Sequence, residues 1–297
     1  MIIVRLLGGL GNQMFQYAAG RALSVRHNTT LKLDLTCLLD RSPRENYAYR
    51  DYALGIFNIR ESFATPQEIA RCVGNYSNPV QRWLFKARRK IGMTPKYLIE
   101  IPYQFTPGFL RAPADSYLDG YWQNEKYFKE IESTIRREFS LKESLSEDSK
   151  PLADQIQTSN SICLHVRRGD LVFNPVTSQY HGVCAIEYFM QAVSLIAARV
   201  AKPQFFIFSD DVEWCQAEMR LDFPNAIVPN EFAMPTLSDH FQLMTLCKHF
   251  IISNSSYSWW GAWLSENPNK IVIAPRKWLN RADIDTSDVT PPEWLRI

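Results

Sequence analysis

Two adjacent arginines, Arg167 and Arg168, are the residues whose chemistry is most evident in this 297-residue chain. They lie in the run HVRRGD at 165–170, directly after the apolar run Ile162–Leu164, which predicts a buried strand. Guanidinium groups stay protonated and bind phosphate oxygens in pairs. Gly169 permits a sharp turn or a close backbone approach, and Asp170 can hold an arginine in place. The run predicts a grip for a pyrophosphate, although an isolated Arg-Arg pair more often forms a surface ion-pair cluster.

Three further apolar strands in the second half of the chain also end in polar clusters. Residues 205–208 lead into Ser209-Asp210-Asp211, residues 250–252 into Ser253-Asn254-Ser255-Ser256, and residues 271–274 into Pro275-Arg276-Lys277. In open parallel sheets, ligands bind beyond the carboxyl ends of the strands. The repeated arrangement therefore favours one anion-binding cleft over scattered surface charge.

The hydroxyl and carboxylate clusters each admit a binding role and a structural one. Ser255 and Ser256 precede a helix, where hydroxyls and backbone amides bind an anion without a metal, but serines there also serve as simple helix caps. Asp210 or Asp211 can accept a hydrogen bond from a guanine edge or a ribose hydroxyl, or cap the helix that begins near Val212.

The N-terminal segment predicts a strand over 2–7, a helix over 12–26 and a second strand over 31–35, which favours a parallel sheet. Gly9 and Gly11 spell part of a dinucleotide-binding turn, with Asp34 where a ribose-binding acid would lie, but Met14 replaces the third glycine. A nicotinamide-dependent oxidoreductase is therefore an alternative. The polar side chains of Asn12, Gln13 and Tyr17 suit sugar hydroxyls equally well.

Composition and charge bound the remaining possibilities. The net charge of +2 gives no global field that would recruit nucleic acid. No stretch approaches the roughly 20 apolar residues of a membrane span, and six scattered cysteines predict free thiols in a reducing compartment. An Asp-x-Asp spelling at Asp283 and Asp285 follows no apolar strand, so we predict no metal site there. Aromatic residues make up 13% of the chain, which leaves a non-catalytic glycan-binding module as a third alternative.

The polar stretch 140–160 predicts a boundary between two domains, residues 1–150 and residues 151–297. Before it, Asn124 is expected to cap a helix that runs to Phe139.

Three segments together resemble the α-1,2-fucosyltransferases of glycosyltransferase family 11. They are GGLGNQMFQYA at 8–18, HVRRGD at 165–170 and SNSSYSWWGAWL at 253–264, supported by residues 239–249 and 181–184. The segments span nearly the whole chain in the family's order.

The resemblance implies an α/β, GT-B-like fold of two facing Rossmann-like domains with parallel sheets. It implies a C-terminal domain that binds GDP-β-L-fucose and an N-terminal domain that binds the acceptor, with inverting, metal-independent transfer to O2 of a terminal β-galactose. The acceptor would be an oligosaccharide or O-antigen-type glycan. A bacterial, cytoplasmic form without a membrane span, peripheral at the inner membrane surface at most, is expected.

The same resemblance assigns a role to the arginines, and the chemistry of the other residues completes the predicted site. Arg167 maps to the family's critical diphosphate-contacting arginine, with Arg168 beside it. The predicted donor-binding set is His165, Arg167, Arg168, Asp170, Asp210, Asp211, Asn254, Ser255 and Ser256. The predicted acceptor-binding set is Asn12, Gln13, Tyr17 and Trp122. The general base stays open among Asp170, His181, Asp119 and Glu125.

Overall fold

The computed structural model describes residues 1–43, 48–73, 96–169, 172, 175–230, 234 and 236–297, and Asp170 lies outside them. The chain divides into unit 1, residues 1–140 with 287–289, and unit 2, residues 141–286 with 290–297. The division falls before the residue 150 predicted from the sequence. Residues 287–289 belong to unit 1 because the Asp288 carboxylate accepts hydrogen bonds from Lys126 Nζ at 2.6 Å and from the Phe105 N–H at 3.2 Å.

Unit 1 is built on a four-stranded parallel sheet in the order β2-β1-β4-β3. Its strands are β1 (Ile2–Arg5), β2 (Leu31–Asp34), β3 (Tyr97–Ile99) and β4 (Tyr117–Asp119). Its α-helices are α1 (Leu10–Arg26), α2 (Thr36–Leu39), α3 (Pro66–Val73) and α5 (Glu132–Glu138). Short 3₁₀ turns are η1 (Leu54–Ile56), η2 (Pro107–Arg111), η3 (Glu125–Tyr127), η4 (Lys129–Ile131) and η6 (Ser287–Val289). The helix expected from Asn124 to Phe139 is therefore broken into η3, η4 and α5.

Unit 2 is built on a six-stranded parallel sheet in the order β10-β9-β8-β5-β6-β7. Its strands are β5 (Asn160–Val166), β6 (Pro203–Ser209), β7 (Asn225–Ile227), β8 (His249–Ile251), β9 (Val272–Ala274) and β10 (Leu295–Arg296). Its helices are η5 (Glu147–Ser149), α6 (Lys150–Thr158), α8 (Pro175–His181), α9 (Ile186–Ala197), α10 (Val212–Glu218), α11 (Leu237–Leu246) and α12 (Ser256–Leu264).

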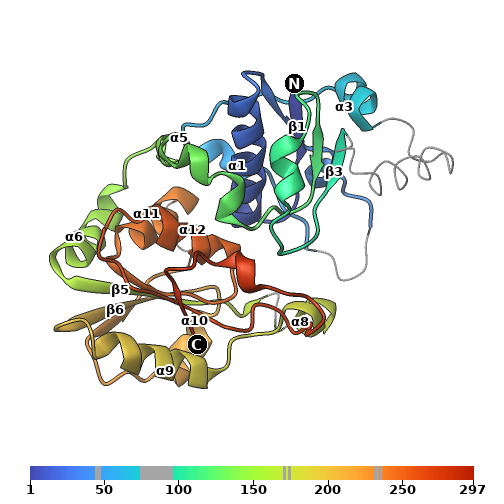
Figure 1. Cartoon of the computed structure of the whole chain (residues 1–297). Coiled ribbons are helices and arrows are strands. Elements are labelled where there is room, and N and C mark those ends of the chain that lie inside the picture. The colour runs from blue at the N-terminus through green and yellow to red at the C-terminus, as the bar shows by residue number, and fades with distance from the viewer. Residues whose placement is uncertain (44–47, 74–95, 170–171, 173–174, 231–233, 235) are drawn as a thin grey trace. The chain divides into compact units, whose positions relative to one another are not determined.

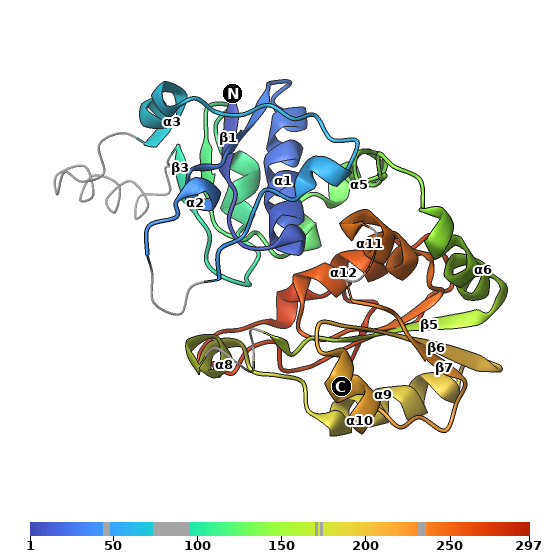
Figure 2. The same ribbon diagram turned by 180° about the vertical axis from the view of Figure 1, so that it is seen from behind.

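The sheet of unit 2 separates two layers of helices. Figures 1 and 2 show α9 and α10 on one side of the sheet and α6, α11 and α12 on the other. Ile162, Leu164 and Val166 share a buried cluster with Phe189 and Val193 of α9. Because side chains alternate along a strand, the intervening residues of β5 point towards the layer of α11 and α12.

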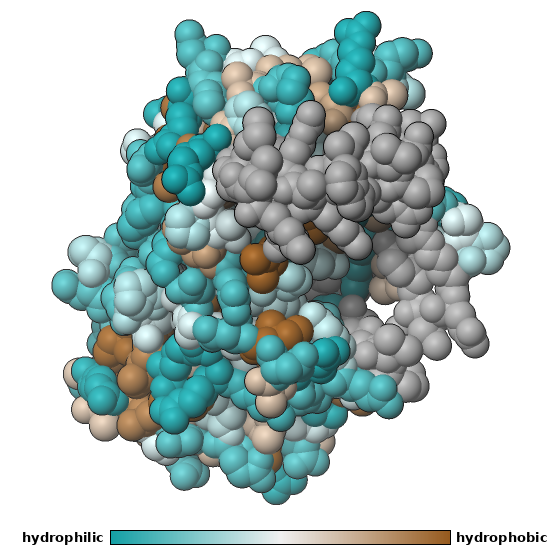
Figure 3. Space-filling view, turned by 45° about the vertical axis from the view of Figure 1, so that its right-hand side comes forward, coloured by the Kyte–Doolittle hydropathy of each residue, from teal (hydrophilic) through white to brown (hydrophobic). Residues whose placement is uncertain are grey.

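Among the described residues, the large hydrophobic side chains that are exposed are Val25, Leu39, Tyr49, Phe63, Ile99, Ile101, Val172 and Leu295. Most of the described surface in Figure 3 is hydrophilic, with small hydrophobic patches between polar residues. Among the residues that the structure describes, none of the helices combines the length and the apolar character of a membrane span.

Candidate functional site

The order of the strands in unit 2 reverses between β5 and β8. From β5 the chain proceeds outward through β6 and β7, whereas β8, β9 and β10 are added on the other side. Such a reversal of strand order is where open parallel sheets bind ligands, at the carboxyl ends of the strands. His165 and Val166 end β5, Arg167 and Arg168 follow it directly, and the Ser253–Ser256 cluster follows β8. The structure therefore brings the two most distinctive sequence clusters to this reversal point.

Arg167 is fixed by an ion pair with Asp210, which follows the neighbouring strand β6. Nη1 of Arg167 lies 2.6 Å from Oδ2 of Asp210, and the Arg168 backbone N–H donates to Oδ1 of Asp210 at 2.8 Å. A Cβ atom added at Gly169 would lie 2.4 Å from Oδ2 of Asp210, so only glycine lets the chain approach so closely. The carboxylate thus orients both the side chain of Arg167 and the turn that carries it.

Arg168 is held by a second carboxylate and by an aromatic ring. Its Nε donates to Oδ2 of Asp211 at 3.1 Å, and its guanidinium carbon lies 4.1 Å from the centre of the Trp214 ring on α10. Oδ1 of Asp211 also caps α10 by accepting the Trp214 N–H at 3.1 Å. Of its two suggested roles, Asp211 therefore fills the capping one, and it also orients Arg168; its contact with the nucleotide stays a prediction. Trp214 was missed from the sequence, because nothing local distinguishes it from a core tryptophan.

The side chains of Arg167 and Arg168 are partly exposed to solvent. Arg167 is 24% exposed and Arg168 is 20% exposed. Partly exposed guanidinium groups that are already oriented can bind an incoming anion without first being ordered.

His165 and Ser253 join the two strands at the reversal point. Nδ1 of His165 lies 2.8 Å from Oγ of Ser253, and both side chains are buried. Burial, with the nearby charges of Arg167 and His240, lowers the pKa of His165 well below its ordinary value. Its imidazole is therefore neutral near pH 7, and its position supports a structural role beside the arginines.

A second buried histidine extends this polar group into α11 and α12. Nδ1 of His240 lies 2.8 Å from the Tyr257 hydroxyl, and the Tyr257 ring lies 6.0 Å from the His165 ring. Burial lowers the pKa of His240 to about 4, so it too is neutral near pH 7.

Asn254 organises the loops around the carboxyl end of β8. Its Nδ2 donates to the carbonyl oxygens of His181 at 3.1 Å, Gly182 at 3.3 Å and Trp278 at 3.2 Å. Its Oδ1 accepts the Cys184 S–H at 3.5 Å. The side chain that was predicted to bind the donor directly is engaged by the protein itself.

Ser255 and Ser256 lie at the start of α12, and both are partly exposed. Ser255 occupies the cap position, yet its side chain makes no capping hydrogen bond to α12. The helix N-terminus carries a partial positive charge and backbone N–H groups, which favour an anion. The side chain of Ser255 therefore does not cap α12, and anion binding by these serines stays a prediction.

Three of the four predicted acceptor-binding residues in unit 1 have buried side chains. Gln13 donates to the carbonyl oxygens of Gly8 and Asp51 and accepts the Ala53 N–H at 2.9 Å. The Tyr17 hydroxyl donates to Glu138 at 2.8 Å.

Trp122 is 1% exposed and packs against the rings of Phe109 and Tyr127. Direct sugar contact requires exposed groups, so the positions of Gln13, Tyr17 and Trp122 favour support of the fold. Asn12 is partly exposed and accepts a hydrogen bond from Gln123 at 2.7 Å.

The candidates for the general base differ in their surroundings. Asp119 forms an ion pair with Arg5 at 2.5 Å and accepts from the Tyr97 hydroxyl, and Glu125 pairs with Lys129 at 3.0 Å. The His181 ring packs edge-on against Tyr180. Within the described ranges both candidate carboxylates are therefore paired with a cation, and the choice of the base stays open.

The carboxylates behind the alternative hypotheses are engaged by the protein. Asp34 is buried, and its oxygens accept the Thr36 N–H at 2.8 Å and the Tyr117 hydroxyl at 2.5 Å, which leaves no group for a ribose. Asp283 pairs with Arg281 through both carboxylate oxygens. The part of the chain that the structure describes contains no cluster of acidic, histidine and cysteine side chains arranged for a metal.

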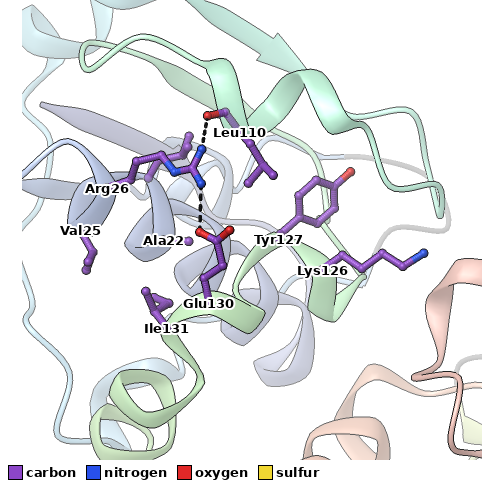
Figure 4. A pocket seen from close by; sticks show the side chains of 9 residues that line it. Ala22, Val25, Arg26, Leu110, Lys126, Tyr127, Glu130 and Ile131 are labelled. Atoms are coloured by element: carbon purple, nitrogen blue, oxygen red, sulfur yellow. Dashed lines mark hydrogen bonds and ion pairs between the residues drawn. The ribbon is translucent and has the colours of Figure 1, made fainter.

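A pocket of about 300 Å³ lies on unit 1 between the last turns of α1 and the turns η2 to η4 (Figure 4). Arg26 donates to the Leu110 carbonyl at 2.6 Å and to Glu130 at 2.9 Å, as Figure 4 shows. The C-terminal end of α1 lies at the amino edge of the sheet, opposite the edge where parallel sheets bind ligands. We therefore place the candidate site at the carboxyl edge of the unit 2 sheet and not in this pocket.

The comparison with known proteins decides the family. Residues 104–297 match Glycosyl transferase family 11. The chain belongs to this family. It is 34% identical to an alpha-1,2-colitosyltransferase of Escherichia coli, over 100% of this chain and 99% of the relative. It is also 34% identical to the O-antigen biosynthesis glycosyltransferase WbnK of Escherichia coli, over 98% of this chain and 99% of that protein.

Membership of the family makes the chain a glycosyltransferase, which displaces the oxidoreductase and the non-catalytic glycan-binding alternatives. Among solved structures, that of an Arabidopsis thaliana FUT1 mutant in complex with GDP has a TM-score of 0.50 at 11% identity, covering 98% of this chain and 74% of that chain. This similarity concerns the fold. Together with the two parallel sheets it confirms the predicted GT-B-like class of two α/β domains.

Proposed function

We propose that this glycosyltransferase transfers L-fucose from GDP-β-L-fucose to O2 of a terminal β-galactose, with inversion and without a divalent metal. The observation that carries the proposal is the pair Arg167 and Arg168, each oriented by its own carboxylate at the reversal point of unit 2. The partly exposed start of α12 lies after the adjacent strand β8 and supplies a second anion-favouring group.

The chemistry of the leaving group explains why two fixed cations suffice. When the bond from the sugar to GDP breaks, negative charge develops on the β-phosphate. Cations that are already oriented towards that charge stabilise the transition state more than the ground state. Arg167 is the proposed principal cation, and Arg168 and the start of α12 supply the others. Attack by the galactose hydroxyl from the opposite face of the sugar gives inversion.

A second donor is favoured by one observation. The relative that is 34% identical over the whole chain is named an alpha-1,2-colitosyltransferase, so a colitose nucleotide is the alternative donor for the same site. The O-antigen glycosyltransferase at equal identity supports an oligosaccharide or O-antigen-type glycan as acceptor.

The test is product analysis. The enzyme is incubated in EDTA with a panel of β-galactosides and either GDP-fucose or the colitose nucleotide, and the linkage is determined by NMR. We expect an α-1,2-linked fucosyl product in EDTA. A product with colitose alone would select the second donor. Transfer that requires added manganese, or no transfer from either donor, would refute the proposal.

A further inference from the structure

Unit 1 has its own reversal point, between β1 and β4. β2 is added on one side of β1, while β4 and then β3 lie on the other. The first turn of α1, which follows β1, and the loop that follows β4 meet there: Nε2 of Gln123 donates to Oδ1 of Asn12 at 2.7 Å. Asn12 was predicted to bind the acceptor, and this pair lies at the edge where a parallel sheet binds its ligand.

The loop that carries Gln123 packs directly on Glu100, the first residue after β3. Oε2 of Glu100 accepts the Tyr121 N–H at 2.5 Å, and the backbone N–H groups of Trp122 and Gln123 also interact with this carboxyl group. A Cβ atom added at Gly120 would lie 2.3 Å from Cβ of Glu100. Only glycine at position 120 therefore lets the loop pack this closely on Glu100. The buried carboxyl group of Glu100 thus holds the backbone of residues 121–123, which carries the Gln123 side chain.

Because this arrangement lies in the unit that the proposed function assigns to the acceptor, the inference rests on that function. We propose that Glu100 is a positioning residue of the acceptor site: it holds the backbone of residues 121–123 and thereby sets Gln123 against Asn12.

The environment of Glu100 makes this support sensitive to protons. The residue is 7% exposed, its Oε1 is buried without a hydrogen-bond partner, and no lysine or arginine among the described residues pairs with it. A titratable group beside it is the buried Tyr127 phenol of η3, and the carbonyl oxygen of Asp119 accepts its backbone N–H at 3.1 Å. Burial raises the pKa of Glu100 to about 7, against the lowering effect of the backbone N–H groups.

The sign of the effect follows from linkage. The pKa of Glu100 is higher when residues 121–123 pack on it than when it is in water. Packing of these residues on Glu100 therefore becomes less favourable as the pH rises from about 4.5 to about 7. Opening that hydrates Glu100 should therefore become up to roughly 70-fold more frequent between pH 5 and pH 8. Above pH 8 the effect is complete.

The first experiment is amide hydrogen exchange of residues 121–123 in the full chain at pH 5 to 8, corrected for the intrinsic exchange rate. We expect protection to fall with rising pH in the wild type and to stay level in Glu100→Gln, whose amide oxygen still accepts an N–H. Glu138→Gln is the matched control, since Glu138 is 6% exposed in the same unit but binds Arg21 and Tyr17. It should keep the wild-type pH dependence at 121–123.

The second experiment separates positioning from general support. Glu100→Ala should raise the acceptor KM about tenfold while the GDP dissociation constant stays at the wild-type value, and Glu100→Gln should restore most of the acceptor KM. A wild-type acceptor KM in Glu100→Ala, equal losses for GDP and acceptor, or an unchanged pH dependence of exchange in Glu100→Gln would each overturn the proposal. If the wild type transfers no fucose, the proposed function fails, and the exchange experiment still decides whether Glu100 holds the loop.

Discussion

The aromatic platform under Arg168 provides a quantitative prediction. The guanidinium carbon lies 4.1 Å from the centre of the Trp214 ring, close enough for a cation–π interaction worth about 0.5 to 2 kcal/mol. Trp214→Leu removes the ring face but keeps an apolar side chain, and the capping bond of Asp211 is retained because it uses the Trp214 backbone N–H. Arg168 then keeps its charge and loses its fixed plane. GDP affinity should weaken by about 2-fold to about 30-fold.

Titration calorimetry with GDP in EDTA measures this effect. Trp214→Phe is the matched variant, because it keeps an aromatic face and should stay near the wild-type dissociation constant. Arg168→Lys should weaken binding at least as much as Trp214→Leu, since lysine cannot combine stacking with the bond to Asp211. A wild-type dissociation constant in Trp214→Leu, measured on folded protein, would refute the reasoning that an oriented Arg168 binds the diphosphate.

Three other changes have defined outcomes. Gly169→Ala places a Cβ atom 2.4 Å from Asp210 Oδ2, so titration calorimetry should show GDP affinity reduced about tenfold, and wild-type affinity would contradict the fixed geometry. Relative to His240→Gln, the wild type should lose up to about 3 kcal/mol of unfolding free energy as the pH falls from 6.5 to about 4, because burial keeps the native imidazole neutral. Urea titrations at each pH test this, and the same pH dependence of the unfolding free energy in both proteins would contradict it. Glu138→Gln should cost about 3 kcal/mol in urea unfolding, since it leaves Arg21, whose side chain is only 14% exposed, without its ion-pair partner, and a loss below about 1 kcal/mol would show that the pair contributes little.

The sequence predicted the parts of the fold that depend on local patterns. Apolar runs ending in polar clusters correctly located β5, β6, β8 and β9, and parallel strands bring such ends to one edge. The continuous helix from Asn124 was wrong, because Asn124 caps only the 3₁₀ turn η3. The return of residues 287–289 to unit 1 depends on contacts of Asp288, which no local pattern encodes.

The candidate site shows the same division between local and non-local information. The arginines and their strand-end position could be read from the sequence, whereas the ring of Trp214 and the loop contacts of Asn254 arise only in the folded chain. The polar character of Gln13 and Tyr17 pointed to a sugar, yet the fold uses both side chains internally. Glu100 was missed because a single glutamate after a short strand has no distinguishing spacing.

The most direct test of the account is the transfer rate of Arg167→Ala in EDTA with GDP-fucose and a β-galactoside, alongside its GDP dissociation constant and its thermal stability. Arg167 forms its ion pair with Asp210 at the reversal point of unit 2, so we predict a folded protein with GDP affinity reduced at least tenfold and no detectable transfer. A folded Arg167→Ala variant with near-normal turnover would contradict the assignment of the diphosphate site.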